Sequence, residues 1–157
     1  SAEADAGFMK KLSEEGKYQI TDEMRKRLGD FAGGYADEED TAEEIRERYE
    51  KDGYVIDPHT AVASAVYGKY RKETGDATRT VIVSTASPFK FETSVMKALG
   101  KPHELPDLEL ADALSAVSGT PVPQAVAGLR VAEIRHKTVC DRDEKAMAAE
   151  VEKFLGI

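Results

Sequence analysis

The stretch Thr80-Val-Ile-Val-Ser-Thr-Ala-Ser-Pro-Phe-Lys-Phe91 begins with a continuous run of β-branched residues and then becomes polar. Such runs are typical of strands that are buried on both faces of a parallel sheet. Tyr54-Val-Ile56 is a second strand candidate, and Pro58 after it suits the first position of an apolar helix. Strands that alternate with helices build right-handed crossover units. The expected fold is therefore α/β, a partial three-layer sheet of mostly parallel strands flanked by helices.

Hydrophobic periodicity and capping residues predict the remaining elements. A strand is also expected over 137–140, a strand or a loop over 31–35, and a closing helix capped by Asp141. Further helices are expected over 7–16, 21–29, 38–51, 105–117 and 124–129. No repeat or low-complexity tract interrupts them.

Length and composition limit the class of protein. A chain of 157 residues is about one domain, which can bury about 70% of its unfolded surface. The net charge of −8, with basic and acidic residues interleaved, argues against nucleic acid, and no apolar run approaches the roughly 20 residues of a membrane span. The start has no signal-peptide pattern, and the single Cys140 has no metal-ligand spacing around it, so a cytoplasmic protein without a metal site is expected.

Two polar segments each follow a predicted strand, so both are expected at the rim of the sheet where α/β proteins bind ligands. The first is Asp57-Pro-His-Thr-Ala-Val-Ala63, in which Asp57 is expected to cap the following helix. His59 has a reference pKa of about 6.5, which suits general acid or base catalysis. A histidine that only packs or hydrogen-bonds at a helix start is the commoner case.

The second segment runs from Ser84 to Phe91. The hydroxyls of Ser84 and Thr85 can contact a ring nitrogen, or they can satisfy a turn amide. Lys90 lies between two phenylalanines, and a lysine desolvated by aromatic neighbours can form a Schiff base with an aldehyde cofactor. More often such a lysine extends its charge to solvent.

In this order, the two segments resemble the threonine synthase family of the longer bacterial and fungal type. That family has Asp-Pro-His-Thr-Ala-Val followed by Thr-Ala-Ser-Pro-(aromatic)-Lys-Phe. The stretch from Gly33 to Asp57 is also similar, and the resemblance covers at least 31–99 and less distinctly the remainder. It implies that 3–157 form the carboxy-terminal α/β region of a fold type II pyridoxal-phosphate enzyme, like the tryptophan synthase β subunit. Ser1 and Ala2 are set aside as a possible remnant of a cleaved tag.

The resemblance also implies an activity and a set of contacts. The family converts O-phospho-L-homoserine and water to L-threonine and phosphate. Thr85 would meet the pyridine nitrogen of the cofactor, with Ser84 as the second choice, and Lys90 and His59 would lie at the rim of the substrate site. The family's Schiff-base lysine and its phosphate loop lie upstream of the matched motifs. No catalytic residue is therefore expected in this chain.

The expected partners are an amino-terminal domain of the same enzyme and the small substrate O-phosphohomoserine, with neither nucleic acid nor membrane. Pyridoxal phosphate is expected in the full-length enzyme and not on this fragment, which should be inactive alone. One alternative is a stand-alone α/β ligand-binding or interaction module without catalysis. Another is a small independent enzyme in which Lys90 carries the cofactor.

Overall fold

The computed structural model describes residues 1–157, and 58% of them are helical. No β-strand is present. The elements in chain order are α1 (Ala2–Glu15), α2 (Asp22–Arg27), α3 (Glu38–Asp52), α4 (Pro58–Thr74), the short 3₁₀ helix η1 (Pro88–Lys90), α5 (Glu92–Ala98), α6 (Asp107–Ser118), α7 (Gln124–Gly128) and α8 (Glu144–Leu155).

The predicted α/β fold is wrong for this structure, because none of the expected strands forms. Residues 80–83 form neither a helix nor a strand, and no backbone hydrogen bond joins them to another segment. Val81 and Val83 are 82% and 71% exposed, so the run has neither a neighbouring strand nor a covering layer. A β-branched sequence predicts a strand only where a second segment can complete the ladder. Segments 31–35 and 137–140 also lack strand structure.

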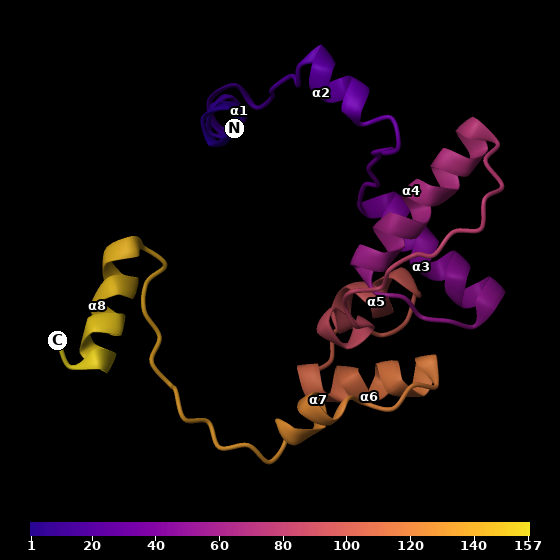
Figure 1. The fold of residues 1–157 in the computed structure, drawn as a ribbon. Helices are drawn as coiled ribbons and strands as arrows, with labels where there is room; N and C mark the ends of the chain where they lie inside the picture. Colours follow the sequence, from indigo (N-terminus) through magenta and orange to yellow (C-terminus); the bar gives the residue numbers. More distant parts are fainter.

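The core lies where α3, α4, α5 and α6 meet (Figure 1). α3 packs against α4 and α5, and α5 in turn packs against α6 and η1. Segment 54–56 contributes Val55 and Ile56 to this core although it is not a strand. The other buried apolar residues are Ile45, Ala61, Phe89, Val95, Met96, Ala98, Leu99, Leu110, Ala111 and Leu114.

Local capping chemistry sets several helix ends, and the cap of α4 lies where the sequence predicted it. Asp57 caps α4 with Pro58 at its first position, and Gly75 ends it in the left-handed conformation with φ 71°. At that φ any residue other than glycine would be strained. The start of α8 was predicted wrongly, because its cap is Asp143 and not Asp141. α5 and η1 were not predicted, since each is too short to show a helical period.

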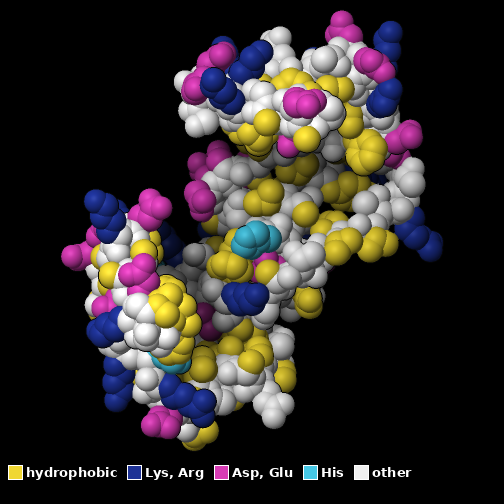
Figure 2. Space-filling model, turned by 60° about the vertical axis from the view of Figure 1, so that its left-hand side comes forward, with side chains coloured by type: hydrophobic (Ala, Val, Ile, Leu, Met, Phe, Trp, Pro, Cys, Tyr) yellow, Lys and Arg dark blue, Asp and Glu magenta, His cyan; other side chains and the backbone are white.

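Much of the chain's surface is uncovered. The accessible area is 12667 Å², whereas a compact protein of 17.2 kDa exposes about 7,800 Å². α1, α2 and α8 bury no residue, and in Figure 1 they lie apart from the helices of the core. Figure 2 shows hydrophobic side chains reaching the surface in several separate areas. None of the helices has the length and apolar character needed to cross a bilayer.

The small core should account for most of the chain's stability. Replacing Ile45, which is 1% exposed, by alanine should reduce the free energy of unfolding by about 2–5 kcal/mol. The matched Val81→Ala change should alter it by less than about 0.5 kcal/mol, because Val81 already faces solvent. Urea unfolding followed by far-ultraviolet circular dichroism measures both. A loss at Val81 as large as that at Ile45 would show that residues 80–83 are packed.

Candidate functional site

The carboxylate of Asp57 lies at the centre of the candidate site. Asp57 follows segment 54–56 and caps α4, and its side chain is fully buried. Asp57 is the only acidic residue among the buried residues of the chain. A buried charge is stable only when hydrogen bonds replace the lost hydration.

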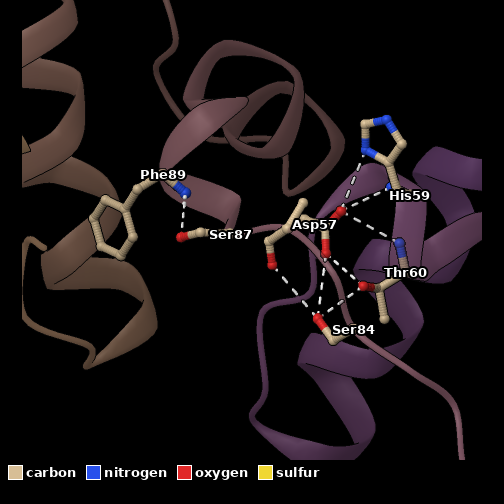
Figure 3. Close-up of polar contacts among 7 residues, drawn as sticks. Asp57, His59, Thr60, Ser84, Ser87 and Phe89 are labelled. Carbon is tan, nitrogen blue, oxygen red and sulfur yellow. Dashed lines mark hydrogen bonds and ion pairs between the residues drawn. The ribbon is translucent and has the colours of Figure 1, made fainter.

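Those hydrogen bonds come from both polar segments that the sequence singled out (Figure 3). Oδ1 accepts from the backbone amides of His59 at 2.9 Å and Thr60 at 3.3 Å. Oδ2 accepts from the Thr60 hydroxyl and, at 3.5 Å, from the Ser84 hydroxyl. The Thr60 and Ser84 hydroxyl oxygens are themselves 2.9 Å apart. Asp57 and Thr60 thus join the start of α4 to the segment that follows residues 80–83.

These contacts determine the charge state of Asp57. Burial opposes ionisation of the carboxyl group, but hydrogen bonds from the Thr60 hydroxyl and from the Thr60 and His59 amides outweigh it. Their balance, with a smaller contribution from the charge of His59, holds the pKa of Asp57 below its ordinary value. Asp57 is therefore a carboxylate at neutral pH and acts only as a hydrogen-bond acceptor.

A second contact joins the same two segments. The His59 and Phe91 rings lie with their centroids 4.9 Å apart at an interplanar angle of 47°. His59 Nδ1 is 3.4 Å from Asp57 Oδ1, while 64% of the His59 side chain stays exposed. His59 therefore lies at the surface beside the buried carboxylate, in contact with a residue of the second segment.

The predicted site residues have different environments. Ser84 belongs to the Asp57 network, whereas Thr85 is exposed and its hydroxyl makes no hydrogen bond within the chain. Lys90 is also exposed, at the end of η1, because Phe89 turns into the core and Lys90 does not. The structure thus brings Ser84 and His59 to the same carboxylate, and it leaves the side chains of Thr85 and Lys90 without hydrogen bonds or ion pairs to the rest of the chain.

No three His, Cys, Asp or Glu side chains of the structure are grouped so that they could hold a metal ion. The start of α4 is not a free anion site either. Its first amides already donate to Asp57, so they are not available to a phosphate.

A separate groove of about 830 Å³ lies between segment 32–35 and α4. Lys69 borders it and makes a 2.6 Å ion pair with Asp40, which lowers the pKa of that carboxyl. None of the predicted site residues lines the groove. Its aromatic lining consists of Tyr35, Tyr67 and Tyr70.

Comparison with known proteins decides the family. The family described as "Threonine synthase, C-terminal" matches residues 60–151, more than half of the chain. The chain belongs to the threonine synthase C-terminal family. The match contains the second polar segment and begins at Thr60, inside the first.

Several relatives in the threonine synthase family are similar over parts of the chain. Threonine synthase of Schizosaccharomyces pombe is 39% identical over 71 residues, which are 45% of this chain and 14% of that protein. Threonine synthase-like 1 of Homo sapiens is 32% identical over 90 residues, 57% of this chain and 12% of that protein. The Macaca fascicularis protein of that name is 27% identical over 149 residues, 92% of this chain and 20% of that protein.

Among solved structures, the pyridoxal-phosphate-bound threonine synthase of Brucella melitensis is 28% identical, with a TM-score of 0.49. It covers 78% of this chain, and the chain covers 25% of it. The chain thus spans a quarter or less of the length of these threonine synthase relatives.

Thr60 is the residue of the candidate site that was not predicted from the sequence. Its hydroxyl donates to Asp57 and contacts Ser84, so it connects the two segments. The signal was present, because a hydroxyl residue three positions after an N-cap aspartate occupies the position where capping boxes place their second polar side chain.

Neutralising Asp57 should lower the free energy of unfolding far more than neutralising Asp37, the exposed N-cap of α3. Asp57→Asn should lower the free energy of unfolding at pH 7 by about 1–3 kcal/mol, because an amide replaces a charged acceptor of buried donors. Asp37→Asn should have little effect, since asparagine caps exposed helices as well as aspartate does. Chemical unfolding of the three proteins measures the difference.

The effect at Asp57 should also depend on pH. Because the pKa of Asp57 is lowered in the folded chain, ionisation stabilises the fold above the unfolded-state pKa of about 3.9. This stabilisation should disappear as the pH falls through the folded-state pKa. The gap between wild type and Asp57→Asn should therefore narrow in acid. A gap that stays constant from pH 7 to pH 3, or an equal loss at Asp37, would contradict an ionised buried carboxylate.

Proposed function

We propose that this chain is the carboxy-terminal part of a threonine synthase that converts O-phospho-L-homoserine and water to L-threonine and phosphate. The observation that carries this proposal is the joining of the two family-like segments through Asp57, which leaves the Thr85 hydroxyl unbonded next to the fixed Ser84. Family membership supports the reaction class.

The proposed role of the chain is to contact the ring of pyridoxal phosphate, the cofactor of the Brucella melitensis relative. When bound, that cofactor supplies an electron sink for carbanion chemistry. A neutral hydroxyl such as that of Thr85 suits a ring nitrogen, since it can donate one hydrogen bond without carrying charge. Thr85 is exposed and has no competing partner.

The chain's own residues fit only part of this cofactor. The α4 amides are engaged by Asp57, so the start of that helix does not hold the cofactor phosphate. Lys90 is exposed and therefore lacks the desolvation that would make it a good aldehyde-binding amine. We assign Lys90 and His59 to the rim, where a cation and an imidazole can meet an anionic substrate.

The uncovered surface supports an association with further protein. The chain exposes 12667 Å², well above the area of a compact protein of its mass, and α8 has an exposed apolar side that includes Val151, Phe154 and Leu155. The proposed partner is the amino-terminal domain of the same enzyme. Catalysis then requires both parts, because pre-organised contacts from each side of a site lower the barrier together.

A chimera tests this proposal. The chain replaces the matching carboxy-terminal segment of Schizosaccharomyces pombe threonine synthase, and threonine formation from O-phospho-L-homoserine is measured with pyridoxal phosphate present. The chimera should be active, while the 157-residue chain alone should form no threonine. In the chimera, Thr85→Val should reduce kcat/KM by at least about tenfold, the effect of about 1.4 kcal/mol of lost transition-state stabilisation.

Thr80→Val is the matched control, because Thr80 is exposed on the same segment and its hydroxyl bonds only locally to the Thr78 carbonyl. It should retain the activity of the parent chimera. A well-folded chimera without activity would favour a stand-alone binding or interaction module. Turnover by the 157-residue chain alone would contradict its assignment as one part of an enzyme.

A further inference from the structure

We propose that Asp57, acting with Thr60, is a positioning residue that fixes the direction of the Ser84 hydroxyl hydrogen. Ser84 then presents only its lone pairs to a ligand, and Thr85 alone is free to donate a hydrogen bond. The significance for a cofactor ring rests on the proposed function, but the hydrogen-bond direction itself does not.

The network around Asp57 contains two hydroxyl hydrogens. Three oxygens lie in mutual contact: Asp57 Oδ2, Thr60 Oγ1 and Ser84 Oγ. The ionised carboxylate contributes no hydrogen, and each hydroxyl contributes one. The two available hydrogens therefore have to serve the contacts among these three atoms.

Each of these two hydrogens has a direction set by its neighbours. The Thr60 hydroxyl donates its hydrogen to Asp57 Oδ2, because the ionised carboxylate has no hydrogen of its own. The 2.9 Å contact between Thr60 and Ser84 then requires the hydrogen of Ser84. The other intramolecular acceptors for Ser84 are Asp57 Oδ2 and the Ala86 carbonyl, each at 3.5 Å. Each of these acceptors directs the Ser84 hydrogen into the chain.

The neighbouring hydroxyl of Thr85 is not held in this way. Thr85 is exposed and has no bond within the chain, so its hydroxyl can rotate to donate or to accept. Two adjacent hydroxyls of similar chemistry thus differ in what they can offer a ligand. An unprotonated ring nitrogen needs a donor, which Thr85 can provide and Ser84 cannot. Asp57 thereby distinguishes between the two residues without touching the ligand.

Ser87 provides a matched control for this network (Figure 3). Ser87 lies in the same segment, but its side chain accepts from the Phe89 amide at 3.3 Å and does not contact Asp57. His59 is the one titratable side chain that contacts Asp57, at 3.4 Å, and it is the same in every variant compared. Differences among the variants therefore report on the hydroxyl network.

The test follows the carboxyl ¹³C signal of Asp57 by NMR during acid titration of the 157-residue chain, without cofactor. Ser84→Ala should raise the titration midpoint by roughly half a pH unit, because the Thr60 hydroxyl no longer accepts from Ser84 and becomes a weaker donor to the carboxylate. Ser87→Ala should leave the midpoint unchanged. Thr60→Val should raise it further, and Thr60→Ser should restore the wild-type value because the hydroxyl remains.

The same midpoint in wild type, Ser84→Ala and Ser87→Ala would overturn the proposal, since the Ser84 hydrogen would then not point into the network of Thr60 and Asp57. Ser84 is an exposed position, so its alanine variant should fold even if a Thr60 variant does not. A raised midpoint together with an inactive chimera would reject the proposed function and leave the network intact. A failure of the proposed hydrogen-bond direction and a failure of the proposed function therefore give different results.

Discussion

The buried carboxylate of Asp57 is the interaction on which the rest of the site depends. It caps α4, and it holds the segment that carries Ser84 against the start of that helix through Thr60. No strand ladder joins these two parts of the chain, so hydroxyl contacts and the His59–Phe91 ring contact do so instead. Because an unpaired buried charge would be costly, every donor around Asp57 also contributes to the fold. The contacts that stabilise the start of α4 are therefore also the contacts that form the candidate site.

The helices were more predictable from the sequence than the overall fold, for a physical reason. Capping is local, so the sequence pattern that marks Thr21, Asp57 or Gly75 as a helix end lies within a few residues of it. A sheet depends on partners far away in the chain, and residues 80–83 have none in this structure. The run Val-Ile-Val was correctly seen as apolar, but its exposure shows that apolar character alone does not create a layer to cover it.

The site was partly predictable for similar reasons. The ordered pair of segments correctly indicated the family, and Asp57 was correctly expected as a cap. The network could not be predicted, because the Thr60–Ser84 contact joins residues 24 apart in sequence and depends on how 84–91 fold back against α4. The exposure of Lys90 also depends on packing, since only the structure shows that Phe89 turns into the core. The roles of Thr85, Ser84, Lys90 and His59 toward a ligand stay predictions.

The chain is proposed to contribute hydroxyl contacts to a cofactor ring and not the lysine that binds the cofactor aldehyde. The most direct measurement is visible absorbance of the purified chain with pyridoxal phosphate, followed by borohydride reduction and mass mapping of modified lysines. The predicted result is no specific adduct, with only scattered, substoichiometric labelling of exposed lysines. A stoichiometric adduct at Lys90, lost in Lys90→Arg but not in Lys97→Arg, would contradict this division of roles and would indicate an autonomous site.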